Sequence, residues 1–378
     1  MTPAPTVKGW CPGAYRPMMS GDGLVVRVRP FFARLTADQV RGLCDTALNY
    51  GNGFIDLTSR ANLQIRGVAE GDHEQVLLAL RDLRLLDDSP QTEARRNILI
   101  TPLWRPGDIS HRIAGDLLGA LAHLPDLPAK FGFAVDTGAA PLLQDASADI
   151  RVERVASGLS VRADGAEAGR SVRPNGLVSA ISEVIAWFLQ RRTDGERRLA
   201  QTVRRVGLPA KWETTTKQPP GLRPAPGLHP MGCLAGIAFG QVDARALQRV
   251  MTGSKAQALR VTPWRMVLLE GASDVVDAEF ISRPGSPLLT AHACPGAPFC
   301  TSATVKTRAL ARRLAAETPG SVHVSGCAKS CAYRKPANLT LIGRDGRFDL
   351  VRDGHPWDAP HKTGLRPEEI LAELKTHV

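Results

Sequence analysis

Four cysteines near the end of the chain restrict its possible folds and chemistry more than any other feature. They form two pairs, Cys294-x5-Cys300 and Cys327-x3-Cys331, within 38 residues. The other three cysteines stand apart, at Cys11, Cys44 and Cys233. Because a cytosolic chain keeps its thiols reduced, clustered thiols indicate a metal or catalytic site in preference to a disulfide framework.

The spacing of this quartet favours an iron-sulfur cluster over zinc. Thiolates are the standard ligands of such clusters, and four of them satisfy the four irons of a cubane. The gap of five residues between Cys294 and Cys300 is wider than the spacing of about two to four residues that is usual between zinc ligands. We predict a 4Fe-4S cluster bound by Cys294, Cys300, Cys327 and Cys331. Zinc and four buried structural cysteines are the alternatives.

The surroundings of the cysteines are basic. Residues 302–317 predict an alanine- and arginine-rich helix that begins just after Cys300. Its positive end would face the Cys300 thiolate and favour an anionic cluster. Lys329, Arg334 and Lys335 add positive charge near the second pair. These cations either tune the cluster, contact a substrate acid or are solvated surface charges.

The charge of the whole chain predicts an anionic partner. Lys and Arg number 48 against 37 Asp and Glu, which gives a formal net charge of +11. The chain has no long basic block, no zinc-finger spacing and no aromatic-rich RNA-binding signature, so we expect a polycarboxylate small molecule and no nucleic acid. Residues 1–9 contain no apolar run, and 18 consecutive apolar residues occur nowhere. We therefore expect a cytoplasmic chain without a membrane span.

Hydrophobic periodicity predicts several elements. A helix is expected over residues 36–50, capped by Thr36 and ended by Gly51, and an apolar helix over 177–192. Between residues 54 and 68 the sequence alternates as in a strand, so that one face packs and the other is free to bind. The free face would carry Arg60, Asn62, Gln64 and Arg66.

The same plan recurs later in the chain, which indicates an internal duplication. Asp243 would cap a helix, and a strand-like stretch from Leu259 leads to Gly271. At a nearly constant offset, Thr36, Val40, Leu43 and Thr58 correspond to Asp243, Leu247, Val250 and Thr262. Residues 217–230 contain five prolines and predict an irregular linker between the halves.

Motifs along most of the chain resemble those of the siroheme-dependent nitrite and sulfite reductases. The quartet, with Leu-Ile-Gly at 341–343, resembles their cluster signature. Further motifs occur in the expected order at 58–64, 96–98 and 127–131. In that family such motifs hold the carboxylates of the tetrapyrrole, for which arginine forks are suited. The resemblance implies this role for Arg60, Gln64, Arg66, Arg96 and Lys130; the alternative for each arginine is an ordinary surface ion pair.

The resemblance also implies the fold. It is an α+β fold of duplicated nitrite/sulfite reductase-like halves, each a ferredoxin-like half-domain followed by an α/β domain of the 4Fe-4S type. The implied units are half-domains at 1–75 and 231–280, a reductase-like domain without a cluster at 76–216, the linker at 217–230 and the cluster domain at 281–378. We expect a monomer with an internal pseudo-twofold repeat.

Within this superfamily the chain most resembles the precorrin-3B synthases of aerobic cobalamin biosynthesis. The resemblance is carried by GWCPGAYRPM at 9–18, GDGLVVRVR at 21–29 and YGNGFIDLTSRANLQ at 50–64. It implies that precorrin-3A binds where a reductase holds siroheme, so no permanently bound siroheme is expected. The implied activity is that of a monooxygenase, which uses dioxygen to hydroxylate the macrocycle at C20 with closure of a γ-lactone.

The implied reaction also needs electrons. The resemblance implies that they come from NADH or a reductase, through a nicotinamide nucleotide or an electron donor protein, and that a mononuclear non-heme iron assists the 4Fe-4S cluster. The histidines form no compact ligand motif, and the nominal candidates are His111, His229, His292 and His323. Two departures from the reductase pattern indicate rearranged anion contacts. Gly132 stands where the reductases often carry a second lysine, and Trp264 is the counterpart of Arg60.

Two other functions stay open. A small siroheme-dependent nitrite or sulfite reductase would use Cys331 to bridge cluster and siroheme iron. An electron carrier or zinc-stabilised binding module would offer its basic face to a partner. A catalytic tetrapyrrole site predicts that Arg60→Ala or Arg96→Ala weakens tetrapyrrole binding and leaves the iron-sulfur spectrum intact.

Overall fold

The helix predicted over residues 36–50 is present as α1 (Ala37–Tyr50), and a capping box begins it. The Thr36 hydroxyl accepts a hydrogen bond from the Gln39 backbone N–H at 3.2 Å, and the Gln39 side chain accepts one from the Thr36 N–H at 2.9 Å. The computed structural model of the chain describes residues 11–375. Gly9 and Trp10 of the opening motif lie outside the described residues.

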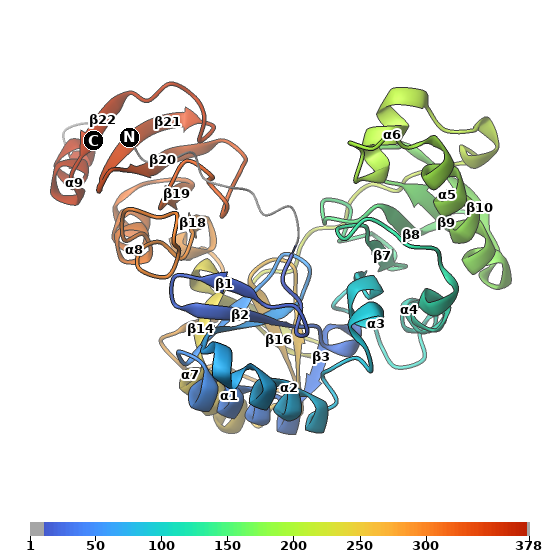
Figure 1. Cartoon of the computed structure of the whole chain (residues 1–378), viewed down its shortest axis with the longest axis horizontal. Helices are drawn as coiled ribbons and strands as arrows, with labels where there is room; N and C mark the ends of the chain where they lie inside the picture. Colours follow the sequence, from blue (N-terminus) through green and yellow to red (C-terminus); the bar gives the residue numbers. More distant parts are fainter. Residues whose placement is uncertain (1–10, 376–378) are drawn as a thin grey trace.

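Two antiparallel sheets form the central lobe, and each takes its last strand from the other half of the sequence (Figure 1). The first sheet runs in the order β1 (Met18–Ser20), β2 (Gly23–Val28), β5 (Leu63–Val68), β4 (Phe54–Leu57) and β14 (Gln241–Asp243). The second runs in the order β12 (Gly227–His229), β13 (Gly232–Ile237), β16 (Met266–Glu270), β15 (Ala258–Val261) and β3 (Arg34–Thr36), with β17 (Phe280–Ile281) against β13.

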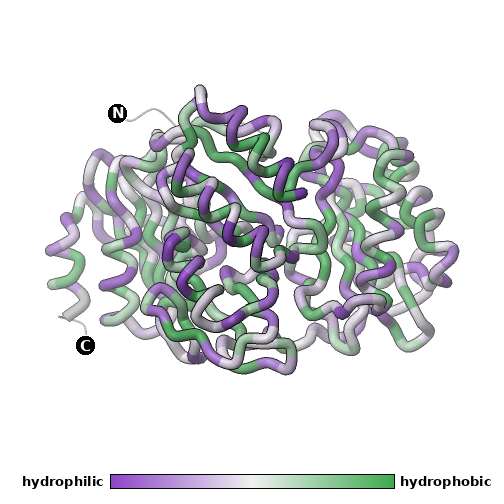
Figure 2. Tube along the Cα trace, turned by 90° about the horizontal axis from the view of Figure 1, so that it is seen from below, coloured by the Kyte–Doolittle hydropathy of each residue, from purple (hydrophilic) through white to green (hydrophobic). Residues whose placement is uncertain are grey.

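Helices cover one side of these sheets. They are α1, α2 (His73–Asp82) and α7 (Ala244–Gly253). Seen from this side, hydrophilic and hydrophobic residues alternate along the helices (Figure 2). In α1 the apolar positions Val40, Leu43 and Ala47 are buried, as expected for a helix that packs one face on a core.

The prediction of one continuous strand over residues 54–68 is wrong, because a tight turn divides it into β4 and β5. The Thr58 hydroxyl accepts hydrogen bonds from the N–H groups of Arg60 and Asn62, at 3.3 and 3.1 Å. Ala61 has a left-handed φ of 53°, which completes the turn. Of the four polar residues assigned to one face, only two lie on a strand, Gln64 and Arg66 on β5.

The second half of the central lobe repeats the order of elements of the first. Asp243 caps α7 by accepting a hydrogen bond from the Ala246 N–H at 3.0 Å, much as Thr36 caps α1. A short 3-10 turn with a left-handed phenylalanine precedes each helix: Phe32 has a φ of 54° and Phe239 one of 59°. β15 and β16 then follow α7 as β4 and β5 follow α1.

One hydrophobic core joins the two predicted half-domains, so they do not pack as separate units. Its buried residues come from both halves, between Ala14 and Phe280. Val76, Leu80 and Leu85 also belong to this core, because α2 packs on α1. The boundary predicted after residue 75 therefore lies too early, and α2 is part of the central lobe.

The second lobe has its own core beside a six-stranded sheet. The strand order is β11 (Thr215–Thr216), β10 (Ala168–Val172), β9 (Gly158–Ala163), β8 (Ile150–Val155), β7 (Phe133–Asp136) and β6 (Ile98–Ile100). The helices in this stretch are α3 (Pro90–Arg95), α4 (Ile109–Ala120), α5 (Leu177–Arg191) and α6 (Leu199–Val206). α5 confirms the apolar helix predicted over 177–192. The chain then has no helix or strand from 217 to 226, within the predicted linker.

The third lobe contains the cysteine quartet. Its sheet runs in the order β18 (Ala291–Ala293), β19 (Val322–Ser325), β20 (Ala337–Arg344), β21 (Arg347–Gly354) and β22 (Lys362–Leu365), with helices α8 (Arg308–Glu317) and α9 (Pro367–Lys375). No helix among the described residues is long and apolar enough to span a membrane.

The start predicted for the helix after Cys300 is wrong, because α8 begins at Arg308. The preceding residues bond to the cysteine loops instead of forming a helical turn. The Ala303 N–H donates to the Cys300 carbonyl at 3.0 Å, and the Thr307 hydroxyl donates to the Cys294 carbonyl at 2.6 Å. Cys300 therefore does not lie at a helix N-terminus.

Candidate functional site

The two cysteine pairs follow neighbouring strands of the third lobe. β18 and β19 are parallel, with Ala293 opposite Val324, so their carboxyl ends meet at one edge of the sheet. Cys294 follows β18 directly, and Cys327 follows β19 after Gly326. The topology thus places the first cysteine of each predicted pair in adjacent loops.

Hydrogen bonds connect these two loops. The Gly326 N–H donates to Cys294 Sγ at 3.1 Å, and the Thr304 N–H donates to the Gly326 carbonyl at 3.0 Å. The Lys329 ammonium donates to Ser302 Oγ at 3.2 Å. An N–H group that donates to a cysteine sulfur is the kind of outer contact that orients and stabilises a thiolate ligand.

The four thiols influence one another electrostatically. Burial raises the pKa of Cys294, as do the neighbouring Cys300 and Cys327 thiols, against backbone hydrogen bonds that lower it. Burial also raises the pKa of Cys331, together with the other three thiols and against Lys329. Thiols with raised pKa values keep their protons until a cation displaces them, so a positively charged metal group would ionise this set.

The donor chemistry of this edge fits an iron-sulfur cluster. All four thiols are free, and the backbone approaches them closely: a Cβ added at Gly326 would lie 2.6 Å from Ala303 Cβ and 3.4 Å from Cys294 Sγ. Within residues 11–375 no three His, Cys, Asp or Glu side chains lie close enough together to hold a metal ion, and this applies to the cysteines and the histidines alike. Their roles as cluster or iron ligands stay predictions.

Gly326→Ala is expected to lower the cluster content of the purified protein. The new methyl group must displace Ala303 and would press on the Gly296 Cα at 3.2 Å, both in the first cysteine loop, and disturbed outer contacts cost about 10–100-fold in metal affinity. Iron and acid-labile sulfide per chain measure the effect. Gly119→Ala on α4 is the matched control, because nothing lies within 4 Å of its added Cβ. Equal cluster contents in both variants would contradict the predicted cradle.

Two adjoining cavities open between the cysteine edge and the other two lobes. One, of about 340 Å³, is lined by Cys294 and Cys331 together with residues of β5. The other, of about 530 Å³, reaches Ser147 in the second lobe. The residues that line both are Ser59, Pro263, Arg265, His292 and Ala332. These volumes lie within the range of about 300–1,000 Å³ that is typical of cofactor and ligand pockets.

Gln64 and Arg66 are the predicted tetrapyrrole contacts that line the cavity beside the cysteines. The Arg66 guanidinium is held by Asp22 at 2.9 Å and Asp56 at 3.2 Å, and its side chain is 6% exposed. Burial lowers the pKa of Arg66, but the two carboxylates together raise this pKa by more than burial lowers it, so the net shift is upward. Arg66 also donates to the Phe299 carbonyl at 3.1 Å, in the first cysteine loop. It is therefore a fixed cation that joins the cavity wall to the cysteines.

Arg60, Arg96 and Lys130 lie elsewhere, where the central lobe meets the second lobe. The Arg60 guanidinium donates to the Lys130 carbonyl at 2.9 Å and to Ser147 Oγ at 3.3 Å. Arg96 is buried, and both oxygens of Asp87 accept from it, at 2.7 and 2.8 Å. Because Ser147 also lines the larger cavity, Arg60 is one side chain away from that cavity. The structure thus divides the five predicted contacts into two groups, and the fork of Arg96 is occupied within the protein.

Two arginines that line the smaller cavity escape prediction from the sequence. Arg265 donates to the carbonyls of Ala291 and Leu289 at 2.6 and 2.7 Å, and burial lowers its pKa to about 10. Arg308, at the start of α8, lies 3.7 Å from Asp56, and burial lowers its pKa as well. Arg265 has a left-handed φ of 59° in the turn that corresponds to that of Ala61, so aligning the two halves could have found it. Arg308 gives no comparable signal.

The four candidate histidines differ in position. His292 lines both cavities and stacks on Tyr333 with ring centroids 3.8 Å apart; burial, with Arg265 and His323, lowers its pKa to about 3. His323 is fully buried, and burial lowers its pKa to about 4. His111 stacks on Trp104, and neither it nor His229 lines these cavities.

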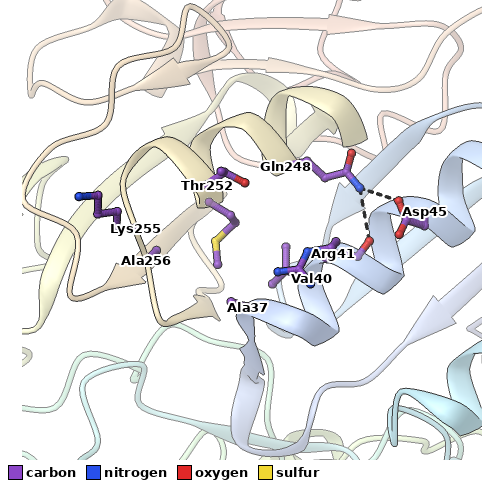
Figure 3. A pocket seen from close by; sticks show the side chains of 9 residues that line it. Ala37, Val40, Arg41, Asp45, Gln248, Thr252, Lys255 and Ala256 are labelled. Carbon is purple, nitrogen blue, oxygen red and sulfur yellow. Dashed lines mark hydrogen bonds between the residues drawn. The ribbon is translucent and has the colours of Figure 1, made fainter.

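A further cavity, of about 500 Å³, lies between α1 and α7 (Figure 3). Arg41 and Asp45 of α1 line it opposite Gln248 and Thr252 of α7. The Gln248 side chain donates to Asp45 Oδ1 at 2.7 Å and so links the two helices. This cavity contains no predicted site residue, so it is not a candidate for the predicted chemistry.

Comparison with known sequences gives three likenesses. The family described as nitrite/sulfite reductase ferredoxin-like half domain matches residues 16–83. A precorrin-3B synthase from Sinorhizobium sp is 31% identical over 392 aligned residues, which cover 92% of this chain and 83% of that protein. A ferredoxin–nitrite reductase from Synechococcus elongatus is 25% identical, over 90% of this chain and 80% of that protein.

A solved structure shares the fold. The NirA protein of Mycobacterium tuberculosis superimposes with a TM-score of 0.61 at 19% sequence identity, over 91% of this chain and 77% of that chain. This likeness concerns the fold alone, and it confirms the α+β reductase-like architecture predicted from the sequence.

Proposed function

This chain belongs to the precorrin-3B synthase family within the nitrite and sulfite reductase superfamily, and we propose that it carries out the family reaction in cobalamin biosynthesis. In this reaction dioxygen hydroxylates precorrin-3A at C20 and a γ-lactone closes. The observation that carries the proposal is the pair of adjoining cavities that connects Cys331 to the arginines of the central lobe, in a chain 31% identical to a precorrin-3B synthase.

The adjoining cavities would hold the macrocycle. A polycarboxylate needs cations around its rim, and the net charge of +11 attracts such an anion. In this proposal Gln64 and Arg66 contact the macrocycle beside the cysteines, while Arg60 of the central lobe and Lys130 of the second lobe contact it where these two lobes meet. Arg96 would contribute directly only by exchanging Asp87 for a substrate carboxylate, so its main role is to support this wall.

The cysteine edge would hold the 4Fe-4S cluster, with Cys294, Cys300, Cys327 and Cys331 as ligands. When bound, such a cluster supplies the single electrons that a monooxygenation consumes. Cys331 is exposed and lines the smaller cavity, so it would lie against the substrate. Arg66 would fix the distance between substrate and cysteines, since it contacts both sides. NADH or a reductase protein would supply the electrons. His292 lines both cavities and is therefore the candidate ligand for a mononuclear iron.

We further infer that the protein acts as a monomer built from two copies of one half-domain. The support is the equal order of elements around α1 and α7 and the crossed strands β14 and β3, each of which completes the sheet of the other half. Such an exchange gives one chain the pseudo-twofold arrangement of a dimer.

Spectroscopy and turnover test the proposed function. Anaerobically purified protein is expected to show the broad brown absorption of an iron-sulfur cluster without sharp siroheme bands. Aerobic turnover of precorrin-3A with isotopically labelled dioxygen should place a single labelled atom in the product, as mass spectrometry would detect. A stoichiometric siroheme spectrum with methyl-viologen-driven reduction of nitrite or sulfite would identify a reductase instead. Zinc without iron or labile sulfide would identify a binding module.

A further inference from the structure

The second half of the central lobe lacks an arginine where the first half has one. In the first half the Arg60 N–H donates to the Thr58 hydroxyl at 3.3 Å. In the second half the Trp264 N–H donates to the Thr262 hydroxyl at 3.2 Å, in the same kind of turn. Trp264 therefore occupies the place of Arg60, and an indole stands where the first half presents a guanidinium.

An arginine from the linker lies over this tryptophan. The Arg223 guanidinium is 5.9 Å from the centre of the Trp264 ring, within the range of a cation–π contact. Both side chains line the cavity of about 530 Å³. The linker thus brings a guanidinium beside the indole of Trp264, whereas the guanidinium of the next residue of the turn, Arg265, is taken up by the carbonyls of Ala291 and Leu289.

The linker is fixed where it delivers Arg223. The Gly221 N–H donates to the Pro141 carbonyl at 2.8 Å, and the Gln144 side chain donates to the Gln218 carbonyl at 2.8 Å. A Cβ at Gly221 would lie 2.7 Å from the Ala140 carbonyl oxygen, so the two segments are in close contact. Arg223 is therefore positioned by its backbone, and its side chain alone is free to change partner.

The present partner of Arg223 is weakly held. Its guanidinium lies 3.1 Å from Asp145, which also lines the cavity, and the two side chains are 50% and 70% exposed. Exposed pairs of this kind contribute little to stability. Arg66 and Arg96, by contrast, are closed in by buried carboxylates. Arg223 is thus a cation of the cavity wall that can exchange its partner at low cost.

We propose that Arg223 binds a carboxylate of the tetrapyrrole substrate and supplies to the second half the positive charge that Trp264 does not. Trp264 orients the guanidinium, and Asp145 holds it until the substrate carboxylate takes its place. The proposal rests on the proposed function, because it assigns a contact within the same cavity. It predicts opposite effects for the two members of one ion pair.

Binding of a porphyrin that carries acetate and propionate side chains, such as uroporphyrin III, tests this on the full-length protein. By fluorescence titration, Arg223→Gln is expected to weaken binding about tenfold, the loss expected for one charge-assisted hydrogen bond, and to reduce its salt dependence. Asp145→Asn is expected to strengthen binding several-fold, because the competing carboxylate is gone. Trp264→Leu should weaken binding less than Arg223→Gln.

Controls separate this contact from a general loss of charge. Arg249→Gln removes an arginine of α7 that is paired with Asp277 and does not line the cavity, so it should leave binding unchanged. Unchanged binding in Arg223→Gln, or weaker binding in Asp145→Asn, would overturn the inference while the proposed function stands. A wild-type protein that binds no polycarboxylate porphyrin would overturn both.

Discussion

Cys294→Ala is expected to abolish the iron-sulfur cluster and to reduce turnover of precorrin-3A at least about 100-fold. Cys294 is the buried thiol of the quartet, it accepts a hydrogen bond from the Gly326 N–H, and its pKa responds to the neighbouring Cys300 and Cys327 thiols. Its loss removes one of the four predicted ligands of a cluster that needs all of them. Iron, acid-labile sulfide and the visible spectrum of anaerobically purified protein measure the result.

Cys233→Ala is the matched control for this prediction. Cys233 is also a buried free cysteine, at 3% exposure, but it lies in β13 within the core of the central lobe. Its replacement should leave cluster content unchanged. A cluster retained in Cys294→Ala, or lost to the same extent in both variants, would refute the assignment. Stoichiometric zinc in the wild type would favour the zinc alternative.

Arg96→Ala is expected to lower the free energy of unfolding by about 3–5 kcal/mol, the loss typical of a buried charge left without its partner. The Asp87 side chain is 2% exposed and would lose its cationic partner inside the protein. Arg96 also donates to the Arg29 carbonyl at 2.7 Å and lies 4.0 Å over the Phe31 ring. Urea denaturation followed by circular dichroism measures the change. This result would add a loss of stability to the weaker tetrapyrrole binding that the sequence predicts for Arg96→Ala.

Two further variants isolate the cause. The double change Asp87→Asn with Arg96→Gln removes both charges and should recover much of the lost stability. Arg60→Gln should keep wild-type stability and weaken tetrapyrrole binding, because Arg60 donates to a carbonyl and a hydroxyl and not to a carboxylate. If Arg96→Ala and Arg60→Gln proved equally stable, the structural role of the Arg96–Asp87 pair would be excluded.

Local signals explain what could be predicted from the sequence. Thr36 and Asp243 cap α1 and α7 by accepting hydrogen bonds from backbone N–H groups three residues further along the chain. The start of each helix can therefore be predicted from a few neighbouring residues. The spacing of the cysteines is local too, and the parallel pairing of β18 and β19 brings the two pairs to one edge. The fold class followed from motifs spread along the chain, and the solved relative shares it.

Contacts between distant residues explain what could not be predicted. The partners of Arg66 include Asp22, 44 residues away, and Arg308 lies near Asp56 only after the third lobe docks. The periodicity of the sequence does not reveal such ion pairs. Arginines that looked equally able to bind a substrate carboxylate therefore differ in whether their guanidinium groups are already paired within the protein. Distant contacts also explain why α8 begins at Arg308 and not at the predicted Ser302. Residues of the intervening segment form hydrogen bonds to Cys294 and Gly326, which compete with a helical turn. The alternation over 54–68 hid a turn that the Thr58 hydroxyl stabilises.

The exchange of strands in the central lobe has a consequence for how the chain is made. β3 pairs with β15, and β4 pairs with β14. The partners of these two first-half strands are therefore synthesised only about 200 residues later. Until then two sheet edges keep their N–H and C=O groups unpaired, a state that invites aggregation. The second lobe, whose core lies between residues 100 and 212, can fold during this interval. Synthesis therefore completes the domain in the middle of the chain before the one that surrounds it.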